Sequence, residues 1–336
     1  MKKTIIKGTG RYVPPRRVTN EDLTRLMDTT DEWIVQRTGI QQRYWVPEEG
    51  GVGSSDLGLE ASRIAMERAG WTPEDIDLII FATLSPDIFF PGSGCLLAHK
   101  LGLTSTPALD IRQQCTGFLY GLATADAYIR SSLAKRILLV GAEVHSTGLD
   151  ISTQGRDVTV IFGDGAAAVC LEHAETDVNA GVLASCLHAD GSLAESLMIT
   201  APASRENPRI NASMLEARMH YPVMDGRNIF KNAVRRLPEV AGEALEQAGI
   251  PLEAIDLFIP HQANLRINQA FAKALDLPES KVYNNIQRYG NTTAASIPLA
   301  LDEAIERNVV SAGSTIMFLG LGAGVTWGAV IYQFAT

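Results

Sequence analysis

The sequence is poor in cysteine, in long apolar runs and in basic charge. Its 336 residues include four scattered cysteines that fit neither a disulfide framework nor metal-ligand spacing, so we expect a reducing, cytoplasmic environment and no metal. No stretch reaches the roughly 18 apolar residues of a membrane span, and the charged start of the chain lacks the apolar core of a signal peptide. The formal net charge of −9 argues against nucleic-acid binding. We therefore expect a globular protein without nucleic-acid or membrane partners.

A repeated pattern organises what is present. Residues 61–87 and 240–266 both read as a helix, a stop glycine, a proline, Ile-Asp-Leu and then a buried strand. The stop glycines Gly70 and Gly249 match at a spacing of 179 residues, and so do the aspartates of the two Ile-Asp-Leu segments. A strand followed by an apolar helix comes after each copy. Two unrelated segments that match by chance are the alternative to an internal duplication.

The duplication predicts an α/β fold of two pseudo-symmetric halves, residues 1–175 and 176–336. The length fits this division, because single hydrophobic cores rarely exceed about 250–300 residues. Helices that alternate with apolar strands predict mostly parallel sheets.

Cys115 lies between a buried strand at 108–111 and a helix of small and apolar residues that begins at Thr116. The first N–H groups of a helix have no intrahelical partner and favour negative charge, so we expect the pKa of this thiol to be lowered. This position suits a nucleophile. The remaining cysteines lack such a context and are interpreted as structural: Cys95, Cys170 and Cys186.

His261 and Asn291 each follow a predicted strand of the second half. The carboxyl ends of parallel strands share one edge of a sheet, so we expect both side chains to converge with Cys115. The alternative for His261 is a purely structural role, in which its side chain only satisfies local hydrogen bonds. The glycine turn at 320–324 is not followed by a helix, which argues against a dinucleotide-binding loop.

Five motifs together resemble β-ketoacyl-acyl-carrier-protein synthase III, a family of thiolase-like condensing enzymes. They are Asp-Glu-Trp-Ile-Val-Gln-Arg-Thr-Gly-Ile at 31–40, the Cys115 helix, Phe-Gly-Asp-Gly at 162–165, Pro-His-Gln-Ala-Asn at 260–264 and Tyr-Gly-Asn-Thr at 289–292. The resemblance implies a duplicated thiolase-like fold with αβαβα layers, and a homodimer. Thiolases proper would have a second catalytic cysteine near the C-terminus, and elongating synthases would have histidine at position 291.

The resemblance also implies a decarboxylative Claisen condensation, the first step of fatty-acid biosynthesis. Cys115 would take the acyl group of an acyl-CoA, and malonyl-acyl-carrier protein would then lose carbon dioxide to give an enolate. Neutral His261 and Asn291 would hold the enolate oxygen. Backbone N–H groups would form the oxyanion hole, at Cys115 and in the turn of Gly322, Ala323 and Gly324. Coenzyme A enters as the substrate thioester, and no cofactor is expected to remain bound.

Binding residues follow from the same resemblance. The expected coenzyme A contacts are Trp33, Arg37, Arg156, Arg227, Phe230, Asn264 and Arg266. Arg227 departs from the family, which usually has asparagine there. Phe89 and Phe90 resemble the segment that reaches into the acyl pocket of the partner subunit in the dimers of this family.

Basic residues in an acidic chain suggest a docking face for an acidic carrier protein. Lys231 and Arg235 are four residues apart and share one face of a predicted helix. We expect the docking face to comprise Lys231, Arg235, Arg236, Arg266 and Lys273.

Three questions stay open at the level of sequence. The same motifs occur in enzymes that make specialised products, such as alkylquinolone precursors or head-to-head acyl condensates, and a non-catalytic subunit would lack the cysteine. Malonate could arrive on carrier protein or on coenzyme A. The stretch 201–222 is either a surface flap or, through Met214, Leu215, Met219 and Tyr221, a flexible wall for a starter longer than acetyl.

Overall fold

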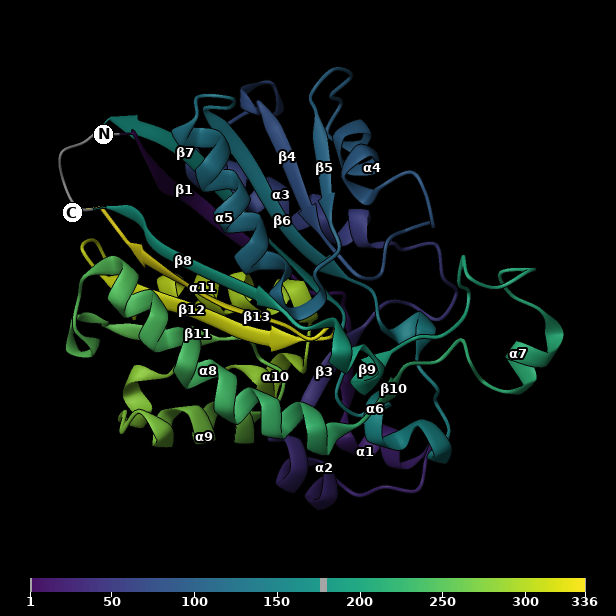
Figure 1. Ribbon diagram of the computed structural model, residues 1–336. Coiled ribbons are helices and arrows are strands. Elements are labelled where there is room, and N and C mark those ends of the chain that lie inside the picture. The colour runs from purple at the N-terminus through teal and green to yellow at the C-terminus, as the bar shows by residue number, and fades with distance from the viewer. Residues whose placement is uncertain (1, 176–179, 336) are drawn as a thin grey trace.

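Two mixed β-sheets form the frame of the molecule in a computed structural model that describes residues 2–175 and 180–335 (Figure 1). The strand order of the first sheet is β1 (Lys2–Tyr12), β7 (Gly165–Glu175), β6 (Arg136–Glu143), β4 (Leu78–Ala82) and β5 (Ala108–Ile111). The strand order of the second is β11 (Leu257–Pro260), β12 (Thr315–Gly322), β13 (Thr326–Gln333) and β8 (Gly181–Ala189).

Helices cover both sheets and fill the space between them, so the predicted αβαβα layering is confirmed. Helices α5 (Gly117–Arg130) and α11 (Ser296–Glu306) pack between the sheets, which is why both are rich in buried apolar residues. Helices α3 (Ser54–Ala69) and α4 (Ser93–Lys100) cover the outer face of the first sheet. Helices α8 (Gly226–Ala248) and α9 (Leu265–Ala274) cover the outer face of the second.

Shorter elements surround this core. They are β2 (Arg16–Thr19), α1 (Asn20–Thr24), α2 (Asp31–Thr38), β3 (Gln42–Trp45), α6 (Arg156–Thr159), β9 (Leu197–Met198), α7 (Ala212–Glu216), β10 (Val223–Met224) and α10 (Ile286–Tyr289). The segment that carries α7 extends away from the body of the molecule (Figure 1). Among the described residues, no helix has the length and apolar character needed to cross a membrane. The same residues hold no group of three or more His, Cys, Asp or Glu side chains suited to a metal ion.

The duplication extends to individual hydrogen bonds. Gly70 and Gly249 end their helices with φ of 69° and 66°, a left-handed conformation that glycine adopts without strain. Asp77 accepts a hydrogen bond from the Arg136 N–H (2.9 Å), and its counterpart Asp256 accepts one from the Thr315 N–H (2.8 Å). Each aspartate thus fixes the start of the strand beside it.

The expectation of mostly parallel sheets is wrong, because each sheet is mixed. In the first sheet β1–β7 and β7–β6 are antiparallel, while β6–β4 and β4–β5 are parallel. The second sheet repeats this order, with β8–β13 and β13–β12 antiparallel and β12–β11 parallel. The direct turn between β12 and β13 reverses the chain, whereas a parallel neighbour needs a crossover connection.

The two sheets divide the chain between β7 and β8. The boundary expected between residues 175 and 176 adjoins residues 176–179, which lie outside the described residues, so it stays a prediction.

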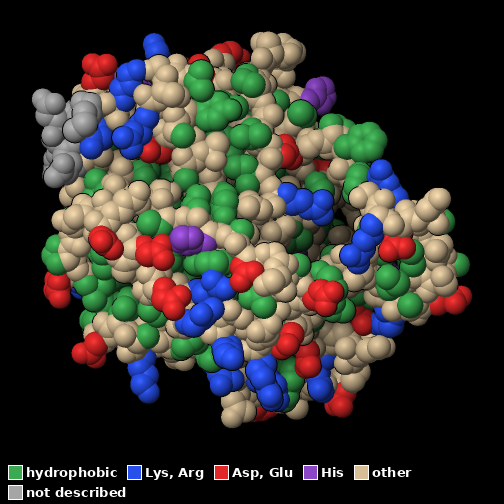
Figure 2. All heavy atoms as spheres, in the orientation of Figure 1, with side chains coloured by type: hydrophobic (Ala, Val, Ile, Leu, Met, Phe, Trp, Pro, Cys, Tyr) green, Lys and Arg blue, Asp and Glu red, His purple; other side chains and the backbone are tan. Residues whose placement is uncertain are grey.

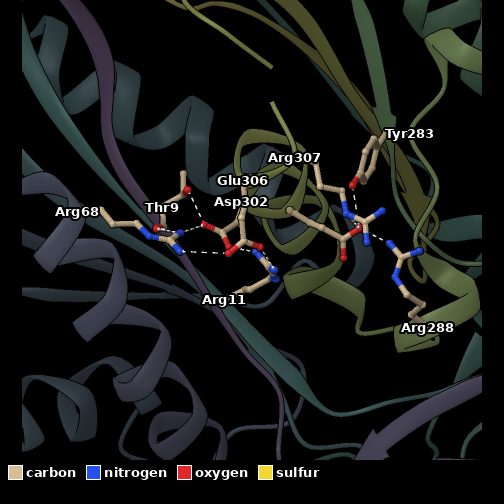
Figure 3. A network of polar contacts seen from close by, with 9 residues as sticks. Thr9, Arg11, Arg68, Tyr283, Arg288, Asp302, Glu306 and Arg307 are labelled. Carbon is tan, nitrogen blue, oxygen red and sulfur yellow. Dashed lines mark hydrogen bonds and ion pairs between the residues drawn. The ribbon is translucent and has the colours of Figure 1, made fainter. Parts of the chain in front are cut away.

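Polar contacts join the halves beside α11 (Figure 3). The carboxylate of Asp302, fully buried in the second half, accepts the Thr9 hydroxyl at 2.6 Å and pairs with Arg11 and Arg68 of the first half. The neighbouring Glu303 is also buried and interacts with a separate set of side chains: Tyr283, Arg288 and Arg307. Asp302 therefore links β1 and α3 to the central helix of the other half.

Candidate active site

Two sharp turns that lead into the central helices bring the halves together at the site. The first turn follows strand β5, but the second follows helix α10, so the strand predicted before Asn291 is wrong, and only an isolated bridge pairs Asn291 with Phe162. Gln114, immediately before Cys115, has φ of 43°, and Thr293, 179 residues later, has φ of 48°. Non-glycine residues rarely adopt this conformation, and such strain concentrates at functional sites. Each turn leads directly into a central helix, so side chains near the two helix N-termini face the same region.

Cys115 lies against the turn that joins β12 to β13. The Ala323 N–H lies near enough to the Cys115 sulfur to lower the pKa of the thiol. A Cβ on Gly322 would lie 2.4 Å from the Cβ of Cys115 and 2.8 Å from its Sγ, so only glycine fits this close approach. The structure thus brings the predicted oxyanion turn, Gly322–Gly324, next to the predicted nucleophile.

His261 is buried and neutral beside this turn. Burial first, and the nearby His145 second, lower its pKa to about 3. Its Nδ1 lies 2.6 Å from Ser296 Oγ, which also accepts the Gln262 N–H at 3.3 Å. We assign the Ser296 hydroxyl as the donor to Nδ1 and the ring proton to Nε2, the tautomer in which the unpartnered nitrogen can donate. Among the described residues, Nε2 has no hydrogen-bond partner, so its N–H is available to a ligand.

Asn291 is held by backbone hydrogen bonds on both sides. Its N–H donates to Ile161 O (2.9 Å), and its carbonyl accepts the Gly163 N–H (3.0 Å). Its side-chain Oδ1 accepts the Thr293 N–H at 2.9 Å. Since a backbone N–H requires an acceptor, this contact fixes the amide orientation and leaves the NH₂ group free to donate.

The expected lowering of the Cys115 pKa is wrong for the free enzyme. Burial, with a smaller contribution from the negative charge of Glu143, raises the pKa of this thiol to about 12, and the Ala323 N–H offsets part of the rise. Cys115 is buried, with 5% of its surface exposed, so loss of hydration outweighs the helix N-terminus. Cys115 is therefore a neutral thiol in the resting protein.

Glu143 is a buried acid that sequence reasoning missed. Burial raises its pKa to about 7, although its carboxylate accepts hydrogen bonds from the Leu84 N–H (3.2 Å) and the Ser85 hydroxyl (2.6 Å). It also accepts the Ala294 N–H at 3.4 Å, at the start of the second central helix. One signal was present in the sequence, since Glu143 precedes Gly322 by the repeat spacing of 179 residues.

A cavity of about 580 Å³ opens at Cys115 and Thr293. Its apolar wall comes from Leu84, Val144, Leu149, Phe162, Leu197, Met198, Ile199 and Pro222. Figure 2 shows a hollow beside the α7 segment, bordered by basic side chains. The cavity lining includes neither His261 nor Asn291. The four residues considered for the starter wall do not line it either, because the α7 segment extends away: Met214, Leu215, Met219 and Tyr221.

The predicted coenzyme A residues gather on another face, where α2, α8 and α9 meet. The Trp33 ring is flanked by the guanidinium groups of Arg37 at 4.5 Å and Arg156 at 4.7 Å. The Asn264 amide donates to Arg37 O at 2.9 Å. Arg266 lies 5.8 Å from the Phe230 ring, and Arg227 is exposed on α8.

Four residues of the expected docking face are exposed, namely Lys231, Arg235, Arg266 and Lys273. Arg236 departs from that prediction. Its guanidinium lies 3.8 Å from the centre of the Trp327 ring and pairs with Asp190 at 2.9 Å, so it faces inward.

Phe89 and Phe90 are 60% and 77% exposed and do not line the cavity of their own chain. Their place in a partner's pocket stays a prediction.

Comparisons with known proteins agree with this architecture. Residues 109–191 match the family model of 3-oxoacyl-(acyl-carrier-protein) synthase III, and residues 245–334 match the model of its C-terminal part. Fold and sequence together define a condensing enzyme of the acyltransferase type. The chain belongs to the 3-oxoacyl-(acyl-carrier-protein) synthase III family.

Solved structures of family members are similar over nearly the whole chain. The 3-oxoacyl-(acyl-carrier-protein) synthase III of Aquifex aeolicus is 42% identical, with a TM-score of 0.88 and coverage of 98% of this chain and 100% of that one. The Pseudomonas aeruginosa enzyme is 35% identical, with a TM-score of 0.89 and 99% coverage of both chains. A priming β-ketosynthase of a polyketide pathway is 30% identical, with a TM-score of 0.88 and coverage of 99% and 96%.

Proposed function

We propose that this protein condenses an acyl-CoA starter with malonyl-acyl-carrier protein, with loss of carbon dioxide, to give a β-ketoacyl-acyl-carrier protein. One observation carries the proposal. Cys115 lies against the Gly322–Gly324 turn, with His261 beside Gly320, and within the described part of the chain neither His261 Nε2 nor the Asn291 NH₂ has a hydrogen-bond partner.

The first half-reaction transfers the acyl group to Cys115. The sulfur forms a bond to the thioester carbonyl carbon, the bond to the coenzyme A sulfur breaks, and the proton of the cysteine thiol ends on the released coenzyme A. Backbone N–H groups at Cys115 and Ala323 stabilise the tetrahedral oxyanion, and each such donor is worth about 2.7–4 kcal/mol. No permanently bound cofactor is needed for this step.

The second half-reaction forms the carbon–carbon bond. Malonyl thioester loses carbon dioxide, and the electron pair of that bond becomes an enolate. His261, neutral at physiological pH because of its low pKa, and Asn291 donate to the enolate oxygen. The enolate carbon then attacks the carbonyl of acyl-Cys115, and the cysteine leaves as the thiolate that recovers a proton.

A specialised role is the second candidate. The 30% identity to a polyketide priming ketosynthase favours it, because that reaction would use the same residues with a different carrier protein. Starters presented with carrier proteins of both pathways would separate the two candidates.

The test begins with the purified protein and a series of acyl-CoA thioesters from acetyl to octanoyl. Mass spectrometry should show one acyl adduct on Cys115, absent from Cys115→Ser. Addition of malonyl-carrier protein should then release a β-ketoacyl product, and malonyl-CoA serves as the comparison substrate. Acylation without any condensation product would overturn the proposal.

The assembly and location also belong to this proposal. We expect a cytoplasmic homodimer in which the exposed Phe89 and Phe90 are covered. Light scattering of the parent and of Phe90→Ser tests the dimer, since a monomeric parent would contradict it.

A further inference from the structure

The turn that presents the Ala323 N–H has little support of its own. It lies at the end of the β12–β13 hairpin and contains two glycines, which make its backbone pliable. One anchor is the Thr326 hydroxyl, which contacts Ala323 O at 3.3 Å and the Thr116 hydroxyl at 2.8 Å. The position of a catalytic N–H depends on such anchors, because a misplacement of about 1 Å costs up to roughly 10²-fold in rate.

A second anchor comes from the neighbouring strand. Asp190, just after β8, exchanges two backbone hydrogen bonds with Val325: its N–H donates to Val325 O at 2.8 Å, and its carbonyl accepts the Val325 N–H at 3.1 Å. Val325 directly follows the turn. Whatever fixes Asp190 therefore also fixes the C-terminal side of the turn.

Arg236 of α8 and Ser192 together hold the carboxylate of Asp190, since the Ser192 N–H (3.1 Å) and hydroxyl (2.6 Å) donate to Oδ1. Arg236 Nη2 pairs with Asp190 Oδ2 at 2.9 Å, and its guanidinium stacks on Trp327, two residues beyond Val325, at 3.8 Å. The arginine side chain is 14% exposed, so this contact is more shielded from salt than a surface pair. A planar guanidinium makes both contacts at once, which lysine cannot do.

We propose that Arg236 is a positioning residue that holds the Gly322–Gly324 turn, and with it the Ala323 N–H, against Cys115. It acts through Asp190 and Trp327 and does not touch substrate. The expected effect of Arg236 on turnover rests on the proposed function, whereas its expected effect on the reactivity of the Cys115 thiol does not. Arg236 thus has a positioning role, whereas its neighbour Arg235, exposed on the same helix, keeps the predicted role in carrier-protein docking.

The test compares Arg236→Gln and Arg236→Lys with Arg235→Gln. The first readout is the alkylation rate of Cys115 by iodoacetamide across a pH series, which requires no substrate. A weakened Ala323 contact destabilises the thiolate, so both Arg236 variants should alkylate about tenfold more slowly at a given pH, equivalent to a profile shifted upward by about one pH unit. Arg235→Gln should alkylate like the parent.

The second readout separates kcat from KM. Arg236→Gln should slow acylation of Cys115 by about 10- to 100-fold while the KM for malonyl-carrier protein stays unchanged. Arg235→Gln should do the reverse and raise that KM. If Arg236→Gln raises the KM and leaves alkylation unchanged, Arg236 belongs to the docking face and the inference is overturned.

Asp190→Asn keeps the inference testable if an Arg236 variant folds poorly. It removes the charge of the pair but keeps both backbone hydrogen bonds to Val325, and it should slow alkylation in the same direction. The double variant should be no slower than the slower single variant, because both act through one contact. Independent, additive effects would contradict the proposal, and melting temperatures of all variants exclude global unfolding as the cause. If the parent failed to condense any substrate, the alkylation result would still decide the role of Arg236.

Discussion

Replacement of Asn291 by aspartate tests the enolate site with the smallest change in shape. Asn291 Oδ1 already accepts the Thr293 N–H at 2.9 Å, and one carboxylate oxygen of Asn291→Asp would accept it equally well. The backbone should therefore stay in place. The second oxygen replaces the NH₂ donor and puts a negative charge where the enolate charge develops.

The expected loss combines two effects. Removal of one donor to a developing oxyanion costs about 2.7–4 kcal/mol. Repulsion between two charges about 4 Å apart adds about 4 kcal/mol at an effective dielectric constant of about 20. Decarboxylation should fall by at least about 10³-fold at neutral pH, whereas acylation of Cys115, which uses backbone donors, should survive.

The sign of the pH dependence makes this prediction specific. Asn291 is 5% exposed, so burial would raise the pKa of a carboxyl group introduced there. Below that pKa the carboxylic acid carries a proton that can be donated to the enolate. Decarboxylation by Asn291→Asp should therefore recover as the pH falls, whereas Asn291→Ala should show no such recovery. In the parent and in Asn291→Ala, His261 stays neutral over this pH range because its pKa is about 3.

The assay follows carbon dioxide release from malonyl-carrier protein without acyl-CoA, between about pH 5 and pH 8. Rates are expressed relative to Asn291→Ala at each pH, because both variants keep Glu143, whose pKa is about 7. If Asn291→Asp decarboxylates as fast as the parent, Asn291 does not bind the enolate. If both variants give the same pH profile, the introduced acid does not face the substrate.

Four further changes test other parts of the site and fold. Cys115→Ala should still decarboxylate malonyl-carrier protein but form no acyl-enzyme by mass spectrometry, and loss of decarboxylation would contradict separate half-reactions. Ser296→Ala removes the hydroxyl that fixes the His261 tautomer, so decarboxylation should fall about tenfold with acylation unchanged; equal losses in both steps would contradict the tautomer assignment. The double charge reversal Lys231→Glu and Arg235→Glu should raise the KM for malonyl-carrier protein and leave acyl-CoA kinetics alone, and equal effects on both substrates would rule out docking there. Asp302→Asn leaves two arginines of the other half without their buried anion, so urea titration should show a loss of roughly 3 kcal/mol; an unchanged midpoint would mean that these contacts do not join the halves.

Local patterns in the sequence sufficed to predict the layers of the fold. Stop glycines, Ile-Asp-Leu segments and apolar central helices are local features, and a strand that runs into a helix places its junction residue near the sheet edge. The predicted convergence of Cys115, His261 and Asn291 also relied on a strand before Asn291, and the structure has helix α10 there instead.

Features that depend on three-dimensional surroundings could not be read in this way. The pKa of Cys115 depends on its burial between the two halves, which outweighs the helix terminus. Strand direction in each sheet depends on whether the connection crosses the sheet face, and apolar strand patterns do not reveal this. Arg236 shows a third limit, because one residue along a helix is a rotation of about 100°. That step turned it from the exposed side of Arg235 toward Trp327.

The internal repeat carries a consequence for how such a protein could evolve. Glu143 and Gly322 occupy equivalent strand ends, and Cys115 and Ala294 occupy equivalent helix starts. The two halves have diverged at these positions. The first half has the side chain of Glu143, whereas the second half has a glycine, because any Cβ at Gly322 would collide with Cys115. A cysteine introduced in the second half by Ala294→Cys would face the carboxylate of Glu143 in place of a glycine, so that single substitution would not reproduce the environment of Cys115. The two halves thus share a fold but not a chemical environment at their helix starts, and only the first half offers a site for a nucleophile.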